Sequence, residues 1–172
     1  MVTVILGLGS NMGGPVANIR WALRAIDDEI GPVRAVSSAY ETEAIGFADQ
    51  PDFVNAVAIV ESELQPAEVL RAAQVIETRL GRKRTIMWGP RVMDIDVLFY
   101  DDRIVESPEL VIPHPRIGER LFVLAPLAEV APDWPIPGVG KAKDAAASLT
   151  GKQRCERIPD VRLWPPVREE DK

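Results

Sequence analysis

The sequence FVNAVAIV, residues 53–60, is a run of β-branched and apolar residues without a charge, which is typical of a buried strand. A less clear strand candidate precedes it at about residues 33–42. Helical patterns flank this pair of strands, with apolar residues at steps of three and four. The first helix has its apolar stripe at Val16, Ile19, Leu23, Ile26 and Ile30, and Gly31-Pro32 ends it. The second begins near Pro66, ends at Gly81 and has its stripe at Val69, Ala73, Ile76 and Leu80.

Two further strands complete the pattern. VTVILGLG at residues 2–9 comes before the first helix, and DIDVLFY at residues 94–100 comes after the second. The order β-α-β-β-α-β predicts an α+β, ferredoxin-like fold, in which two helices cover one face of an antiparallel sheet. The chain from about residue 101 is rich in proline, with an apolar piece at 121–130 and an alanine-rich helix near 142–149. We therefore expect a single domain over residues 1–172, with its core at about 2–135 and a C-terminal extension at about 136–172.

Composition limits the class of protein. The single cysteine, Cys155, excludes an intrachain disulfide and a cysteine-based metal site. Because the N-terminus also lacks the pattern of a secretory signal, we expect a cytoplasmic protein. No apolar run approaches the ~20 residues that a membrane span requires. The sequence therefore predicts no membrane contact, and we expect a monomer.

The charges are unevenly distributed. The formal net charge is −6, from 20 basic and 26 acidic side chains, and this acidity argues against general nucleic-acid binding, which depends on Lys and Arg. Residues 82–91, however, contain only basic charged side chains, Arg82, Lys83, Arg84 and Arg91. A local basic patch in an acidic protein indicates a small polyanionic ligand.

An Asp-x-Asp pattern follows this patch directly. Alternation along a strand puts Asp94 and Asp96 on one face and predicts Ile95, Val97 and Phe99 on the other. Two neighbouring carboxylates repel each other unless a cation compensates, and Mg²⁺ typically takes one or two carboxylates together with water and substrate phosphates. Alone, such a pair more often marks the solvent-facing side of an edge strand. Beside the basic patch, it indicates phosphoryl-type transfer.

Other patterns leave alternatives open. The stretch Gly7-Leu8-Gly9-Ser10-Asn11-Met12-Gly13 suggests a dinucleotide-binding oxidoreductase, but Met12 occupies the place of the third glycine. A second alternative is a non-catalytic ferredoxin-like module that binds a small ligand. The only histidine, His114, lies between two prolines, which fix its backbone for either a structural role or contact with phosphate.

Several dispersed motifs occur together in this order: Gly-Ser-Asn at 9–11, Tyr-Glu-Thr at 40–42, Gln-Pro-Asp-Phe-Val-Asn at 50–55, Gln74 with Glu77, Gly-Arg at 81–82, Trp-Gly-Pro-Arg at 88–91, Asp-x-Asp at 94–96 and Pro-His-Pro-Arg at 113–116. At these residues the sequence resembles the 6-hydroxymethyl-7,8-dihydropterin pyrophosphokinase family of folate biosynthesis. The likeness extends from residue 2 to about 135.

The resemblance implies transfer of pyrophosphate from ATP to the hydroxymethyl group of the pterin, with release of AMP. It implies that Asp94 and Asp96 hold two Mg²⁺ ions and act in catalysis with Arg82, Arg84 and Arg91. The pterin contacts it implies are Thr42, Ile45, Phe53, Asn55 and Phe122. The ATP contacts it implies are Gln74, Glu77, Arg82, Arg84, Trp88, Arg91, Val97, His114 and Arg120. Glu77, one helical turn from Gln74, is expected to face the same way, and the loops at 10–15, 43–52 and 82–90 resemble lids that close over both substrates.

Overall fold

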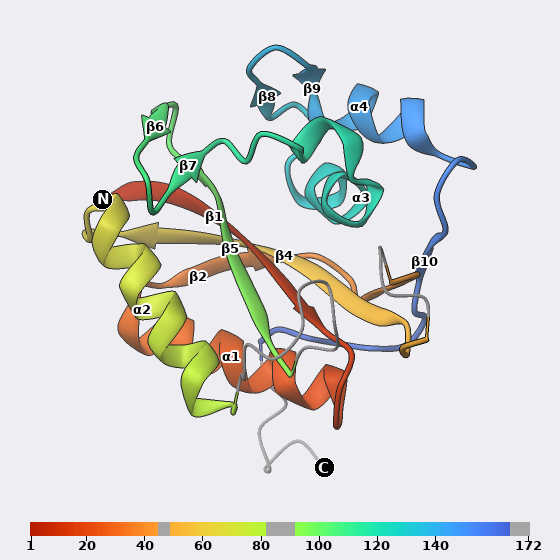
Figure 1. Cartoon of the computed structure of the whole chain (residues 1–172), viewed down its shortest axis with the longest axis horizontal. Coiled ribbons are helices and arrows are strands. Elements are labelled where there is room, and N and C mark those ends of the chain that lie inside the picture. The colour runs from red at the N-terminus through yellow and green to blue at the C-terminus, as the bar shows by residue number, and fades with distance from the viewer. Residues whose placement is uncertain (45–48, 82–91, 166–172) are drawn as a thin grey trace.

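The computed structural model describes residues 1–44, 49–81 and 92–165. Its main sheet has the order β10-β3-β4-β1-β5, and β2 also pairs with β4 (Figure 1). Every pairing in this sheet is antiparallel. The strands are β1 (Val2–Ser10), β2 (Val33–Val36), β3 (Tyr40–Thr42), β4 (Phe53–Ser62), β5 (Asp94–Tyr100) and β10 (Cys155–Arg157).

The strand expected at 33–42 is two strands, so this prediction was wrong in detail. Both β2 and β3 pair with β4, and the break between them begins at Ser37. The main-chain N–H of Ser37 donates to the carbonyl oxygen of Val57 at 2.9 Å. The N–H of Val57 in turn donates to the Ser37 hydroxyl at 2.9 Å. A side chain thus replaces a main-chain acceptor here, and the ladder is interrupted.

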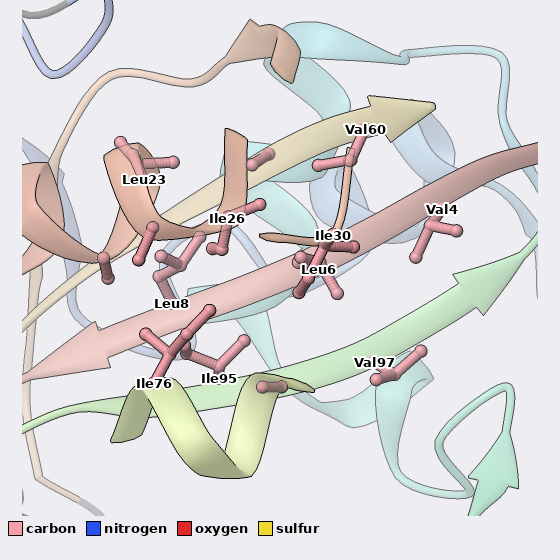
Figure 2. Close-up of a cluster of buried hydrophobic side chains, with 14 of the residues drawn as sticks. Val4, Leu6, Leu8, Leu23, Ile26, Ile30, Val60, Ile76, Ile95 and Val97 are labelled. Atoms are coloured by element: carbon pink, nitrogen blue, oxygen red, sulfur yellow. The ribbon is translucent and has the colours of Figure 1, made fainter. Parts of the chain in front are cut away.

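Two helices, α1 (Pro15–Glu29) and α2 (Pro66–Arg79), pack against one face of the sheet. Each begins with proline in its first turn, where the missing N–H has no helical partner to lose. Figure 2 shows the resulting core, in which side chains of β1 and β5 meet those of both helices. The predicted stripes of both helices are confirmed: Ile19, Leu23, Ile26, Val69, Ala73 and Ile76 are fully buried.

Two more helices, α3 (Leu121–Val130) and α4 (Ala142–Leu149), form a second core on the opposite face (Figure 1). Ile5, Val57 and Leu98 of the sheet meet Leu124 and Leu127 of α3 there. Described residues beyond 135 therefore take part in the packing, since they supply α4 to this core and β10 to the sheet edge. The remaining elements are β6 (Val105–Glu106), β7 (Val111–Ile112), a 3₁₀ turn (Ile117–Glu119), β8 (Pro135–Ile136) and β9 (Gly140–Lys141).

A bulge in β5 changes the face of one predicted residue. Leu6 pairs with Val97 and Ile5 pairs with Phe99, so Leu98 is the extra residue. Ile95 and Val97 face α1 and α2, as predicted. Phe99 lies on the α3 face instead, with its ring centroid 5.5 Å from that of Trp134. The sequence pattern could not locate the bulge, because all the residues around it are apolar.

The turn after α1 depends on a glycine. A Cβ atom on Gly31 would lie 1.9 Å from the carbonyl oxygen of Glu61, so the chain passes β4 at a distance that no other residue permits. Among the described residues, no helix combines the length and the apolar character needed to cross a membrane.

Candidate functional site

The two aspartates of β5 lie on the face of the sheet that α3 covers in part. Asp94 pairs with Gly9 and Asp96 pairs with Gly7, and directly paired residues share a face. Ile5, Gly7 and Gly9 are every second residue of β1 and therefore share one face. Ile5 lies in the α3 core. Asp94 is half-buried and Asp96 is exposed. Both carboxylates therefore project from the part of this face where β1 carries glycines instead of apolar side chains.

The glycine at position 9 makes room for an amide on the neighbouring strand. A Cβ atom on Gly9 would lie 2.7 Å from Asn55 Oδ1, closer than nonbonded atoms approach. The Nδ2 of Asn55 donates to Thr42 Oγ1 at 2.7 Å, and both residues are buried. Thr42 pairs with Phe53 across β3 and β4. Thr42, Phe53 and Asn55 thus form one group, the β3–β4 wall, on the same face as the aspartates.

A second set of side chains approaches this face from the start of α3. The Arg120 guanidinium lies over the Phe122 ring, 5.6 Å from its centroid. Burial lowers the pKa of Arg120, while the charge of Asp96 opposes that shift. The favourable interaction with Asp96 indicates that Arg120 faces the carboxylates. A cation that remains charged beside two acids suits the recognition of phosphate.

His114 is held close to the same cluster in its neutral form. Its burial, followed by the charges of Arg120 and Arg116, lowers its pKa. The main-chain N–H of Arg116 donates to His114 Nδ1 at 3.1 Å. Because Nδ1 accepts, the ring proton lies on Nε2, which makes Nε2 a donor toward any ligand.

Glu77 of α2 supports β5, the strand that carries both aspartates, at the edge of the sheet. Its side chain is only 4% exposed, and its Oε1 accepts from the main-chain N–H of Ile95 at 2.8 Å. Gln74 is exposed, so the expectation that both side chains face the same way was wrong. A helix turns about 100° per residue, and three residues leave an offset that separates core from solvent. Val97 likewise lies in the core on the helix side.

Two neighbouring carboxylates, those of Asp94 and Asp96, are the feature of this site that suits a divalent cation such as Mg²⁺. No group of three or more His, Cys, Asp or Glu side chains that could hold a metal occurs in the parts of the chain that the structure describes. Asp94 and Asp96 offer two carboxylates on one face, and Mg²⁺ takes one or two when substrate phosphates and water complete its coordination. The glycines opposite them on β1 add no side chain that would compete for this space.

Five of the predicted site residues fall outside the described ranges, namely Ile45, Arg82, Arg84, Trp88 and Arg91. The other predicted residues fall into three groups. Asp94, Asp96, Thr42, Phe53 and Asn55 share one face of the sheet, and His114, Arg120 and Phe122 reach the site from the α3 side. Val97 lies in the core on the other face, and Gln74 and Glu77 lie on α2.

Two asparagines that sequence reasoning did not assign connect the loops around the site. Asn11 Nδ2 donates to Gln50 Oε1 at 2.9 Å and to the Pro51 carbonyl oxygen at 3.0 Å. Asn18 Nδ2 lies 2.9 Å from the Met12 carbonyl oxygen and 3.3 Å from that of Val92. Asn11 belongs to the Gly-Ser-Asn motif, from which a role near the site could have been predicted. Asn18 lies inside a helix pattern, and nothing in the local sequence indicates its contacts.

Comparison with known proteins gives one consistent result. The sequence profile of the 7,8-dihydro-6-hydroxymethylpterin-pyrophosphokinase (HPPK) family matches residues 5–132. The chain is 42% identical over 158 residues to the 2-amino-4-hydroxy-6-hydroxymethyldihydropteridine pyrophosphokinase of Pseudomonas aeruginosa, covering 91% of this chain and 96% of that one. It is 43% identical over 159 residues to the enzyme of the same name from Methylorubrum extorquens, covering 91% and 100%.

A comparison of folds agrees with the sequence comparison. The crystal structure of the wild-type HPPK-DHPS of Plasmodium falciparum with pteroate superimposes with a TM-score of 0.69. The identity is 15%, and the match covers 88% of this chain and 43% of that one. At this identity the likeness concerns the fold alone, an α+β arrangement of an antiparallel sheet with, among the described residues, four α-helices.

Replacing Glu77 tests its support of β5. We expect Glu77→Ala to lower the free energy of unfolding by about 1–3 kcal/mol, because it leaves the buried N–H of Ile95 without its acceptor. The matched control is Gln74→Ala on the exposed side of the same helix, expected within about 0.5 kcal/mol of wild type. Urea denaturation measures both, and equal stabilities for the two variants would contradict the assigned contact.

The protonation of His114 can be measured without interference, because the chain has one histidine. Its NMR titration should have a midpoint below the ordinary value of about 6.5, with the neutral ring protonated at Nε2. As the pH falls, the unfolded chain protonates His114 before the folded chain does. The contribution of His114 to the free energy of unfolding is therefore full above about pH 6.5 and declines as the pH falls further. Arg120→Ala should raise the midpoint. A midpoint at or above 6.5 in wild type would show that burial does not govern this ring.

Proposed function

The chain belongs to the HPPK family, and from this membership we infer that it transfers pyrophosphate from ATP to 6-hydroxymethyl-7,8-dihydropterin in folate biosynthesis. The observation that carries this conclusion is the family match over residues 5–132. The aspartate pair beside half-buried Arg120 is the arrangement that phosphoryl-type chemistry requires. A non-catalytic ligand-binding module has no need of that arrangement, and the glycine-rich start of the chain lacks the spacing of an oxidoreductase.

We propose Asp94 and Asp96 as the ligands of two Mg²⁺ ions. Their shared face, their half-buried and exposed settings and the glycines opposite them support this assignment. When bound, the ions neutralise charge on the phosphates and make the pterin hydroxyl more acidic. The carboxylates orient the ions, while Glu77 fixes the strand that carries both carboxylates through its bond to Ile95.

The pterin lies, in this proposal, against the β3–β4 wall. Asn55 already donates to the Thr42 hydroxyl, so the Asn55 carbonyl oxygen meets the donors of the pterin edge and the Thr42 hydroxyl hydrogen meets an acceptor. Phe53 and Phe122 stack on the two faces of the flat ring. The main chain at Ile45 completes the pterin contacts.

We assign ATP to the region between β5 and the start of α3. Arg120 and the Nε2–H of His114 bind phosphate oxygens there, and Gln74 contacts the nucleotide from the exposed side of α2. Arg82, Arg84, Trp88 and Arg91 belong to the same proposal. Of the ATP residues that the family resemblance implies, Glu77 and Val97 act through the strand and its main chain, because Glu77 is buried and bonded to the Ile95 N–H and Val97 is buried on the other face.

The reaction follows from these positions. The pterin hydroxyl oxygen attacks the β-phosphorus of ATP, the bond to the α-phosphate oxygen breaks, and AMP leaves. Arg120 together with Arg82, Arg84 and Arg91 stabilises the negative charge that spreads over the transferred group. We assign no general base. The ferredoxin-like description of the fold, the single domain over residues 1–172, the monomeric state and the cytoplasmic location stay predictions.

The aspartate pair provides the test. Asp96→Ala should reduce pterin-dependent formation of AMP by about a hundredfold or more, since even loss of an outer-shell metal partner costs up to ~100-fold. The fold should persist, because Asp96 is exposed. The control is Asp102→Ala, an exposed acid in the turn after β5, which should turn over like wild type. Asp96→Ala activity within a few-fold of wild type would remove this residue from the metal site.

A further inference from the structure

Three consecutive residues near the C-terminal end of the described chain contact the segments that carry the proposed pterin site. The first is Gln153, whose Oε1 accepts from the main-chain N–H of Leu121 at 3.0 Å. Its Nε2 donates to the carbonyl oxygen of Glu119 at 2.8 Å. The first N–H groups of a helix have no partner within the helix, and α3 has no side-chain cap of its own at Arg120. Gln153 therefore caps α3 and fixes the turn that carries Arg120.

The next residue, Arg154, reaches the other wall. Its Nη2 lies 2.6 Å from Oδ1 of Asp52, the residue that precedes Phe53 in the sequence. The hydrogen bond from Arg154 lowers the pKa of Asp52. Its Nη1 lies 3.8 Å from Glu41 Oε1, beside Thr42. These contacts are exposed, and exposed ion pairs contribute little to stability. They serve to orient the chain on both sides of the β3–β4 wall.

The third residue, Cys155, acts through its main chain. It begins β10 and pairs with Thr42, and its Sγ lies 4.0 Å from the Leu121 carbonyl oxygen. Burial raises the pKa of the thiol to about 11, so the sulfur stays protonated at neutral pH and is a poor nucleophile. Cys155 thus joins the Thr42 strand to the beginning of α3.

The other end of α3 is tied to the same edge of the sheet. Tyr40 Oη donates to Glu129 Oε2 at 2.6 Å, and the Ser38 N–H donates to Glu129 Oε1 at 2.9 Å. The last turn of α3 is thus held at β3, and Gln153 adds two hydrogen bonds at the first turn, where Leu121 and Leu124 are also buried in the core. That first turn carries Arg120 and Phe122.

We propose that residues 153–155 form a clamp that sets the separation between the β3–β4 wall and the first turn of α3, and so positions Phe53 and Phe122 on either side of the pterin ring. This inference rests on the proposed function. A ring held between two aromatic side chains needs them placed within about 0.5 Å, and they come here from separate elements. Gln153 is a positioning residue, because its side chain acts through α3.

The test separates the two substrates. Gln153→Met keeps the length of the side chain and removes both hydrogen bonds, and we expect it to raise the KM for the pterin about tenfold, the effect of losing roughly 1.4 kcal/mol. The KM for ATP should rise less, by about twofold to threefold, because Arg120 lies in the same turn but is only one of several cations assigned to the phosphates. Gln153→Glu keeps the acceptor for the Leu121 N–H and should recover much of the pterin KM. Lys152→Met, at an exposed neighbouring position, should match wild type.

A second variant keeps the proposal testable if Gln153→Met does not fold. Arg154→Met removes only exposed ion pairs and should raise the pterin KM about twofold with an unchanged melting temperature. An unchanged pterin KM in folded Gln153→Met, or in Arg154→Met where Gln153→Met is unfolded, overturns the clamp. An equal rise in both KM values overturns it too, since this would show a general structural role. Absence of pterin-dependent turnover in the wild-type chain would instead contradict the proposed function.

Discussion

The two faces of β1 are the constraint on which the rest of the molecule depends. One face carries Val4, Leu6 and Leu8 into the core with α1 and α2, and the other carries Gly7 and Gly9 beside the aspartates of β5. β1 pairs with both β4 and β5, so its register fixes where Asn55, Asp94 and Asp96 project. Because a shift by one residue would exchange the faces, burial of the apolar side chains also places the polar groups.

Charged side chains surround β5, the neighbour of β1 that carries Asp94 and Asp96. Asp96 interacts favourably with Arg120 on the site face, while Glu77 accepts from the Ile95 N–H of β5 at the edge of the sheet. A buried carboxyl group is costly unless it is hydrogen-bonded, and here the bond to Ile95 holds the strand between Asp94 and Asp96. The same rigidity serves the chemistry, since phosphoryl-type transfer depends on positioning and electrostatic stabilisation.

Much of this arrangement was predictable from local patterns. The helix stripes, the strand at 53–60 and the shared face of Asp94 and Asp96 follow from periodicity alone. The bulge that turns Phe99 was not predictable, because its neighbours are all apolar, and neither was the Ser37 break. The capping of α3 by Gln153 joins residues far apart in sequence, and no local pattern encodes such a contact. The family resemblance implies Glu77 as a site residue, but the burial of its side chain depends on the tertiary packing of α2 and no local pattern predicts it.

The most direct measurement is product analysis after incubation of the whole chain with ATP, Mg²⁺ and 6-hydroxymethyl-7,8-dihydropterin. Attack on the β-phosphorus produces AMP and the pyrophosphorylated pterin in equal amounts, and AMP should appear only when the pterin is present. Formation of ADP would show that a different phosphorus is attacked and would contradict the mechanism. A folded chain without nucleotide turnover would contradict pyrophosphoryl transfer itself.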